Sequence, residues 1–184
     1  SIGKKGKDKY WNWFTDKNKK FEVTMCGIAG LVGKKKINPK TIKACLKSMK
    51  QRGPDNQKSL FLKSKKTNIN FLHSRLSIID IHKRSDQPFQ KYGISLIFNG
   101  EIYNYEEIKV ELIKKGYNFL TESDTEVLLK GYQFWGKSIL NKLEGMFSFA
   151  IYNKKTKELF CYIKLTRRVL RYTFKIYLAR KRKM

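Results

Sequence analysis

The fold prediction starts from residues 26–33, which read Cys26-Gly-Ile-Ala-Gly-Leu-Val-Gly33. Its apolar residues are interspersed with glycines, which is typical of a short buried strand that other backbone approaches closely. The cysteine at its start has two interpretations, because such a residue is either a small buried hydrophobic side chain or a reactive thiol. Taken alone, Cys26 is better interpreted as a small buried side chain, and only motifs elsewhere in the chain can favour a reactive thiol instead.

Downstream of this strand, the residue pattern predicts a series of strands and helices. Ile42, Leu46 and Met49 recur at helical spacing after Pro39, and the turn residues Arg52-Gly-Pro-Asp55 end that helix. The predicted strands lie near residues 59–62, 69–79 and 94–98, followed by a hairpin of residues 146–152 and 158–162.

Two more helices are predicted from their amino-terminal residues. Asn104 and Glu107 have the spacing of a capping box, and the helix that follows them runs to Gly116. Ser123 and Glu126 form a clearer capping box at the start of the next helix. The order of these elements predicts an α+β fold in which two sheets pack together with helices outside them.

The cysteines, histidines and apolar runs indicate the redox compartment of the chain and argue against a zinc site and a membrane span. Cys26, Cys45 and Cys161 are odd in number and lack the spacing of a metal site, which indicates free thiols in a reducing cytoplasm. Cys45 is expected on the apolar face of the first helix and Cys161 in an atypical tail, so neither is assigned a role. With only two histidines, we expect no His-based zinc site. No apolar run reaches the ~18 residues of a membrane span, and no signal peptide is evident.

The net charge of +26 divides the chain into three zones. Residues 1–25 form a basic leader with a net charge of +4, and residues 161–184 form a basic tail with a net charge of +9 and no acid. The remaining +13 is spread over residues 26–160, which read as one globular domain. Such a charge points toward nucleic acid, but lysines scattered along ordinary amphipathic segments favour a solvated surface instead.

Seven motifs in order change the balance for Cys26. They are Met-Cys-Gly-Ile-Ala-Gly (25–30), Arg-Gly-Pro-Asp (52–55), His-Ser-Arg-Leu-Ser-Ile-Ile-Asp (73–80), Gln-Pro-Phe (87–89), Asn-Gly-Glu-Ile-Tyr-Asn-Tyr (99–105), Ser-Asp-Thr-Glu-Val (123–127) and Leu-Glu-Gly-Met-Phe-Ser-Phe-Ala-Ile-Tyr (143–152). Over residues 25–160, this series resembles the class II glutamine amidotransferase domain of glutamine-hydrolysing asparagine synthetases. The resemblance implies the four-layer αββα sandwich of N-terminal-nucleophile hydrolases, which we expect to be incomplete at its carboxyl-terminal end.

The resemblance also implies a chemical mechanism. Cys26 becomes the nucleophile, and its own α-amino group is the general base, because an α-amine has a pKa of about 7.7 to 8. The thiolate attacks the side-chain amide of glutamine and forms a thioester, releasing ammonia. By resemblance, the Asn99 side chain and the Gly100 N–H stabilise the oxyanion. Taken alone, Asn99-Gly100 would instead favour a hairpin turn.

The same resemblance assigns the residues that hold glutamine. Arg75 binds the α-carboxylate, since a guanidinium can form two parallel hydrogen bonds with it. Asp124 binds the α-ammonium, with Glu101 beside it. Four consecutive residues line the pocket: Leu76, Ser77, Ile78 and Ile79. No metal or organic cofactor serves this glutaminase half of the reaction.

Three departures from the family pattern limit what the chain is expected to do. Cys26 follows 25 residues, so its α-amine exists only if Met25 is the initiator and is removed, which we prefer, or if the leader is cleaved. After Phe160, the family's Arg-Asp-x-x-Gly-x-Lys-Pro segment is missing, which suggests a truncated or frame-shifted end. No Ser-Gly-Gly-x-Asp-Ser phosphate loop occurs, so the ATP-pyrophosphatase (synthetase) domain that would use ATP and Mg²⁺ to amidate aspartate is expected elsewhere.

A rival hypothesis from a different class follows from the same departures. A blocked Cys26 amine would leave a catalytically silent binding module on the amidotransferase scaffold. Its basic surface would then make nucleic acid the partner to test, although the preferred partners are L-glutamine and a synthetase domain.

Overall fold

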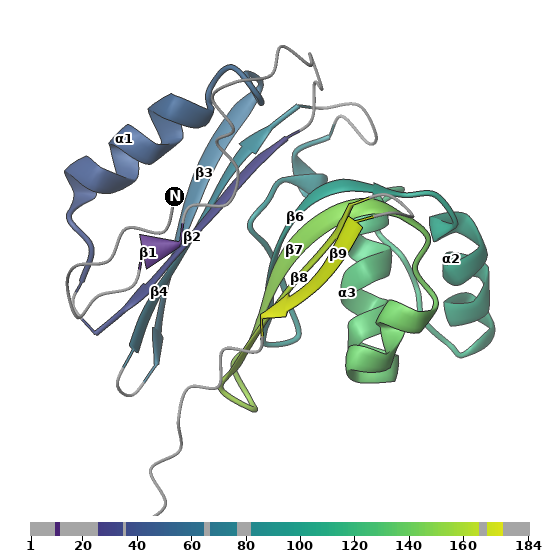
Figure 1. The fold of residues 1–184 in the computed structure, drawn as a ribbon. Coiled ribbons are helices and arrows are strands. Elements are labelled where there is room, and N and C mark those ends of the chain that lie inside the picture. Colours follow the sequence, from purple (N-terminus) through teal and green to yellow (C-terminus); the bar gives the residue numbers. More distant parts are fainter. Residues whose placement is uncertain are drawn as a thin grey trace, which may run out of the picture. The chain divides into compact units, whose positions relative to one another are not determined.

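A computed structural model of the chain describes residues 10–11, 26–34, 36–64, 67–76, 82–165 and 169–174. These residues form two compact units, residues 1–76 and 77–184, and each unit holds one antiparallel sheet accompanied by helices (Figure 1). The expected α+β class with two antiparallel sheets is therefore confirmed.

The first unit contains a four-stranded sheet in the order β1-β2-β4-β3 with one helix lying along it (Figure 1). Its elements are β1 (Tyr10–Trp11), β2 (Gly27–Gly33), α1 (Pro39–Met49), β3 (Asn56–Ser64) and β4 (Thr67–Arg75). The glycine-rich stretch that follows Cys26 is β2, and it lies inside the sheet between β1 and β4. Ala29 and Leu31 of β2 and Leu72 of β4 are buried under the apolar face of α1.

Helix α1 confirms the prediction made from its apolar spacing. Asn38 caps its amino terminus by accepting a hydrogen bond from the Lys40 N–H at 2.9 Å, and Pro39 occupies the first turn, where no N–H is needed. Ile42, Leu46 and Met49 of α1 are partly buried against the sheet.

The second unit is a five-stranded sheet in the order β5-β6-β7-β8-β9. Its strands are β5 (Phe89–Lys91), β6 (Ile94–Ile102), β7 (Gly145–Asn153), β8 (Glu158–Leu165) and β9 (Val169–Phe174). The predicted hairpin is confirmed as β7 and β8, and the predicted domain boundary after residue 160 falls inside β8. β9 was not predicted, because it lies in a segment whose basic composition differs from that of the other strands.

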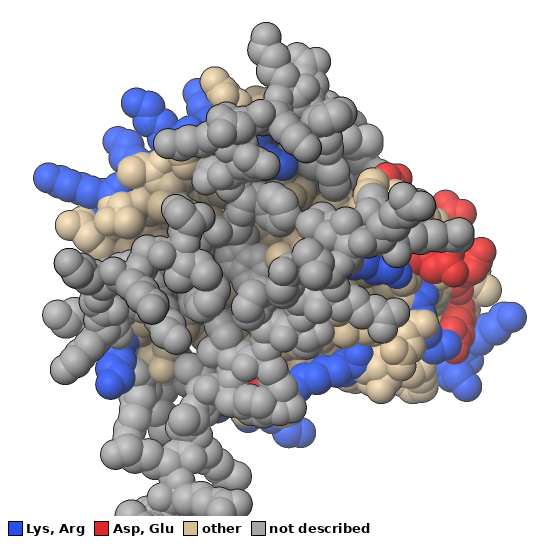
Figure 2. Space-filling model, viewed as in Figure 1, with Lys and Arg blue, Asp and Glu red and all other residues tan. Residues whose placement is uncertain are grey.

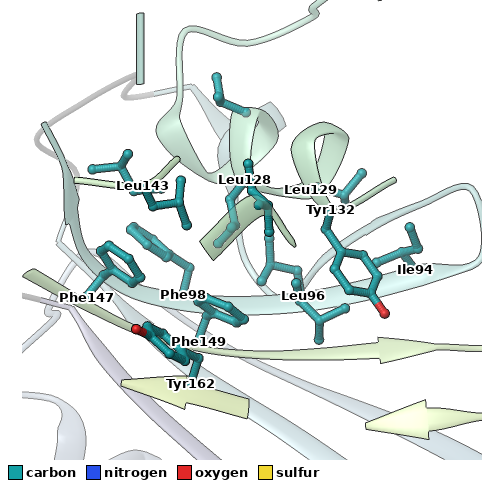
Figure 3. Close-up of a cluster of buried hydrophobic side chains, with 14 of the residues drawn as sticks. Ile94, Leu96, Phe98, Leu128, Leu129, Tyr132, Leu143, Phe147, Phe149 and Tyr162 are labelled. Carbon is teal, nitrogen blue, oxygen red and sulfur yellow. The ribbon is translucent and has the colours of Figure 1, made fainter. Parts of the chain in front are cut away.

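Two α-helices accompany the second sheet, with a 3-10 helix before β5 and another after α3. They are η1 (Lys83–Ser85), α2 (Tyr105–Lys114), α3 (Asp124–Trp135) and η2 (Gly136–Asn141). Figure 3 shows Leu128, Leu129 and Tyr132 of α3 directed toward aromatic and aliphatic side chains of the sheet. On β6 and β7 the members of this core cluster recur at every second position, as the pleat of a strand requires: Ile94, Leu96, Phe98, Phe147, Phe149 and Ile151. Each of these large side chains stabilises the unit by roughly 1.5–3 kcal/mol.

The predicted capping box at Asn104 is wrong. Asn104 does precede α2, but its side chain makes no capping hydrogen bond. Its amide group instead donates to Lys142 O at 2.8 Å and accepts from the Glu144 N–H at 3.0 Å. The reason is tertiary, because those two backbone groups lie in the connection to β7 and need partners of their own.

The capping box at Ser123 is half confirmed. Ser123 Oγ accepts from the Thr125 N–H at 3.1 Å, as an N-cap does. Glu126, however, does not return to Ser123: its Oε2 accepts from the Leu120 and Thr121 N–H groups at 3.0 and 2.8 Å. The Ser123 N–H donates to Thr121 Oγ1 instead, at 3.3 Å.

Charged side chains are unevenly distributed over the described surface. Figure 2 shows acidic side chains gathered over α2, whose first turn carries Glu106 and Glu107. Helix α1 is basic by contrast, with exposed Lys40, Lys43 and Lys47. No helix within the described ranges is long and apolar enough to cross a membrane.

Candidate active site

Cys26 lies directly before β2 and is held against the end of β4. The Leu76 N–H donates a hydrogen bond to Cys26 Sγ at 3.2 Å, and Sγ lies 3.4 Å from Leu76 O. The antiparallel pairing of Gly27 with Ser74 brings these two segments together, although they are 50 residues apart in sequence. An N–H group directed at the sulfur stabilises negative charge that develops there. The thiol is half-buried, as a nucleophile that must meet a substrate needs to be.

Arg75, the proposed carboxylate ligand, is the last residue of β4 and is 6% exposed. The turn Arg52-Gly-Pro-Asp55 packs on it, with the Asp55 N–H donating to Arg75 O at 3.1 Å. Gly53 is required for this contact, because a Cβ atom there would lie 2.2 Å from Ser74 O and 2.6 Å from Arg75 N. The motif thus braces the strand end that carries Arg75.

A residue outside the predicted site, Gln57, supports the same strand end. Gln57 Nε2 donates to Ser74 Oγ and to Leu46 O, and so joins β3, β4 and α1 next to Arg75. No local pattern marks this glutamine, because its partners are 17 and 11 residues away. The only signal for it was its position, two residues after the Arg-Gly-Pro-Asp motif.

Asn99 and Gly100 lie inside β6, paired with Ser148 and Phe147, so the hairpin-turn interpretation of this dipeptide is excluded. Gly100 has φ +131°, and a Cβ atom there would lie 2.2 Å from Met146 O. Only glycine fits this position. Asn99 Oδ1 is buried and makes no hydrogen bond with the described residues. This oxygen only accepts hydrogen bonds, so a ligand would satisfy it with a donor group, and the oxyanion role predicted for Asn99 falls to its Nδ2 group.

Asp124 is the first residue of α3 and is 6% exposed. Its pKa is raised to about 6, mainly by burial and to a smaller extent by the charge of Glu101. The hydrogen bonds that Asp124 accepts from the backbone and from Thr125 act in the opposite direction. One of those bonds comes from the Ile102 N–H, 3.4 Å from Asp124 Oδ2. The electrostatic effect of Glu101 on Asp124 indicates that two acids face the same region, a setting that favours a cation.

The structure therefore assembles the predicted residues in two groups. Cys26, Arg75 and Leu76 lie together in the first unit, and Asn99, Gly100, Glu101 and Asp124 lie along β6 and the start of α3 in the second. The pocket residues Ser77, Ile78 and Ile79 lie outside the described residues. Within the described residues, no group of three or more Cys, His, Asp or Glu side chains could hold a metal ion.

The other two thiols differ from Cys26 in setting. Cys161 is buried in β8, and burial raises the pKa of its thiol to about 12. Cys45 packs against the sheet from α1. All three cysteines lie in described parts of the chain, and none forms a disulfide.

Comparison with known proteins places this geometry in a family. Residues 25–165 match the family model described as a glutamine amidotransferase domain. Among curated proteins, asparagine synthetase [glutamine-hydrolyzing] 1 of Bacillus subtilis is 38% identical over 143 residues, which are 74% of this chain and 22% of that protein. Asparagine synthetase [glutamine-hydrolyzing] 3 of the same organism is 34% identical over 143 residues, with the same two shares.

A solved structure is similar as well. Glutamine phosphoribosylpyrophosphate amidotransferase from B. subtilis, complexed with ADP and GMP, is 27% identical with a TM-score of 0.44, over 54% of this chain and 23% of that one. The chain spans about a fifth of the length of the curated relatives named above.

Proposed function

Because the chain belongs to the glutamine amidotransferase domain family, we propose that it hydrolyses L-glutamine to glutamate and ammonia through a thioester on Cys26. The observation that carries the proposal is the setting of Cys26. This residue directly precedes β2, is the second residue of the family match, and accepts a hydrogen bond at Sγ from the Leu76 N–H. The position of Arg75, directly before Leu76 in the chain, supports the proposal, since the α-carboxylate at the other end of the substrate needs a cation within one glutamine length of the nucleophile.

The first step requires a base for the thiol proton. We assign it to the α-amino group of Cys26, whose ordinary pKa of about 7.7 to 8 suits proton transfer near neutral pH. The sulfur then forms a bond with the amide carbon of glutamine, and the carbonyl π electrons move to oxygen. The Asn99 side-chain amide and the Gly100 N–H are the donors that stabilise this oxyanion.

The second step breaks the carbon–nitrogen bond. The protonated α-amine returns its proton to the leaving nitrogen, so ammonia departs and a thioester remains. Water then attacks the thioester carbon, giving its proton to the amine, and the thiolate leaves. The products are glutamate and the restored Cys26, and no oxidant, metal or organic cofactor takes part.

Substrate recognition uses charges of both signs. The Arg75 guanidinium pairs with the α-carboxylate of glutamine, and Asp124, assisted by Glu101, pairs with its α-ammonium. Leu76 and the adjoining residues 77–79 complete the pocket of this proposal.

The acceptor of the ammonia belongs to a larger assembly in this proposal. We infer that a synthetase domain, in the same or another chain, adenylates aspartate with ATP and Mg²⁺ and receives the ammonia to form asparagine. The support is the naming of the relatives as glutamine-hydrolysing asparagine synthetases, of which this chain matches 22%. The three free thiols favour the cytoplasm as the place of this reaction.

The experiment compares one protein before and after a single cut. A protease site is placed directly before Cys26, and glutamate release from glutamine is measured with the site intact and after cutting. We expect hydrolysis only after cutting, because an intact peptide bond leaves no α-amine. Equal activity before and after would overturn the free-amine mechanism, and no activity in either form would overturn the proposed function.

Covalent labelling gives a second readout on the same samples. 6-Diazo-5-oxo-norleucine, an electrophilic glutamine analogue, should modify Cys26 in the cut form. Cys161 and Cys45 serve as internal controls, since the raised pKa of the buried Cys161 thiol leaves little thiolate. Modification of all three thiols at similar rates would mean that the analogue reacts with any accessible thiol and does not recognise a glutamine site at Cys26.

A further inference from the structure

Gln87 belongs to the Gln-Pro-Phe motif, to which the proposed mechanism gives no role. It lies between η1 and β5, and only 7% of it is exposed. Its side chain uses both ends of the amide: Oε1 accepts from the Phe98 N–H at 2.6 Å, and Nε2 donates to Thr125 Oγ1 at 3.3 Å. The first partner is adjacent to Asn99, and the second is adjacent to Asp124.

The bond to Phe98 replaces a missing strand. β5 pairs with β6 only over Ile94–Leu96, and the pairing ends at Leu96, whose partner is Phe89. Beyond that point no strand of the described residues pairs with β6 on this side, so the next N–H on the same edge, that of Phe98, would be buried without a partner. Gln87 Oε1 accepts this N–H and continues the pairing with a side chain.

The edge of β6 then shows a regular arrangement. N–H groups on one edge of a strand recur every second residue, so those of Phe98, Gly100 and Ile102 share an edge. The outer two are bound by side chains, Phe98 by Gln87 and Ile102 by Asp124. The N–H of Gly100 lies between them.

Both of these side chains are tied to the first turn of α3. Asp124 is part of that turn, and Gln87 reaches it through Thr125, whose Oγ1 lies 3.5 Å from Asp124 Oδ1. The edge of β6 is therefore fastened to α3 on both sides of Gly100. Loss of either bond would let the strand and the helix shift relative to each other.

We propose that Gln87 is a positioning residue for glutamine hydrolysis, which fixes the Asn99-Gly100 segment relative to the helix turn that carries Asp124. The inference rests on the proposed function, because those residues matter only if they bind the oxyanion and the substrate ammonium. Gln87 itself touches neither. Its effect on the reaction passes through Phe98 on one side and Thr125 on the other.

The kinetic test separates the two bonds in the full chain cut before Cys26. Thr125→Val removes the bond to Gln87 together with the bond that Thr125 Oγ1 makes with Asp124, and we expect KM for glutamine to rise about three- to tenfold with kcat within about twofold. Gln87→Leu removes both bonds, so kcat should also fall about tenfold. The double variant should raise KM by less than the product of the two single effects, because the Gln87–Thr125 bond that both variants remove can be lost only once. Additive effects on KM would overturn the proposal.

A matched control distinguishes positioning from a general loss of stability. Ile139→Val removes one methyl group from the core of the same unit, away from β6 and the first turn of α3. It should lower the melting temperature but leave KM and kcat within about twofold of wild type. Kinetic changes in Ile139→Val that match those in Gln87→Leu would reduce Gln87 to a packing residue and overturn the inference.

A third measurement does not depend on activity. Residue-resolved amide hydrogen exchange should show the Phe98 N–H exchanging at least about tenfold faster in Gln87→Leu, while Leu96, paired with β5, keeps its rate. Unchanged protection at Phe98 would overturn the inference even in an active enzyme. Conversely, a cut wild-type chain that hydrolyses no glutamine would overturn the proposed function. The hydrogen-exchange result would still test whether Gln87 binds the Phe98 N–H.

Discussion

Asp124 is a single residue whose proposed binding role opposes stability. Its carboxyl group is 6% exposed, and burial raises its pKa from the ordinary value of 3.8 to about 6. Ionisation of this group inside the protein is therefore disfavoured by roughly 3 kcal/mol compared with the unfolded chain. In the proposed function, pairing with the substrate ammonium would offset this cost.

The consequence for stability has a definite sign. Since the folded chain holds the Asp124 proton more tightly than the unfolded chain does, its contribution to stability is complete below pH 3.8 and is lost as pH rises through about 6. Asp124→Asn removes this titration. We expect the unfolding free energy of the variant relative to wild type to increase by about 2–3 kcal/mol between pH 4 and pH 7.5, measured with urea. The same difference at both pH values would contradict the assignment.

The same variant separates stability from substrate binding. Asn cannot pair with an ammonium group, so KM for glutamine should rise at least about tenfold in Asp124→Asn, although the fold is more stable above pH 6. In wild type, KM should rise as pH falls below about 6, where Asp124 becomes protonated.

Gly100 is constrained by space and by backbone conformation together. Its φ of +131°, and the 2.2 Å that would separate a Cβ atom at this position from Met146 O, leave no room for alanine. Gly100→Ala should destabilise the chain by at least about 3 kcal/mol and abolish glutamine hydrolysis. Urea unfolding measures the first effect and glutamate release the second.

Gly116 provides the matched control for that substitution. It also has a positive φ, +86°, but a Cβ atom there meets nothing within 4 Å. Gly116→Ala should therefore cost about 1 kcal/mol and leave catalysis unchanged. Equal effects of the two substitutions would show that backbone strain alone matters at Gly100.

Among the elements, α3 is joined to the loop that precedes it by the side chain of Glu126, which also forms a buried ion pair with Lys130. Glu126 is fully buried and accepts from the Leu120 and Thr121 N–H groups, while Lys130 Nζ lies 3.2 Å from its Oε1. Burial acts to raise the pKa of Glu126, but hydrogen bonds from Thr121, Lys130 and the Leu120 N–H together outweigh it and hold the pKa below its ordinary value. The first turn of α3, with Asp124, is fixed by this cluster.

Removal of the Glu126 charge tests this dependence. Glu126→Gln leaves Lys130 buried without its counter-charge, so the unfolding free energy should fall by about 3–5 kcal/mol at pH 7. As pH falls below the ordinary carboxyl pKa of 4.5 the difference should shrink, since the unfolded chain takes up the proton first, and it should be lost once pH falls through the lowered pKa of Glu126 in the folded chain. Urea unfolding at both pH values provides the measurement.

Glu122 offers the same substitution in an exposed pair. Its side chain is 72% exposed and pairs with Lys109, so Glu122→Gln should change stability by less than about 1 kcal/mol. In addition, Lys130→Met should restore most of the stability lost in Glu126→Gln, because it removes the buried one of the two cations that pair with Glu126; the other, Lys91, lies 3.3 Å from Glu126 Oε1 and is partly exposed to water. If the double variant is no more stable than Glu126→Gln, the ion pair is not the source of the effect.

At the scale of the whole molecule, the net charge of +26 is the property that the proposed reaction does not use. Glutamine is a zwitterion without net charge at neutral pH, so the long-range field does not steer it. We expect KM for glutamine to change less than about twofold between 50 and 300 mM salt. Binding to generic duplex DNA should fall steeply over the same range, as unspecific contacts with phosphate do.

This comparison also tests the rival hypothesis of a silent nucleic-acid-binding module. DNA binding that persists at 300 mM salt, in a protein that hydrolyses no glutamine after the cut before Cys26, would favour the rival. Glutamine hydrolysis that is unaffected by saturating DNA would exclude it as the main function.

Local sequence signals were sufficient to predict several elements of the fold. Helix α1 and the β7–β8 hairpin followed from periodicity and turn residues, and the ordered motifs singled out Cys26 among three cysteines as the proposed nucleophile. The partners of the polar side chains became evident only in the folded structure. Asn104 binds residues 38 and 40 positions away and does not cap α2, and Gln87 binds a strand edge and a helix turn 11 and 38 positions away. The physical reason is that buried backbone and side-chain groups take whichever partners packing brings within hydrogen-bond distance, and such partners leave no periodic trace in the sequence.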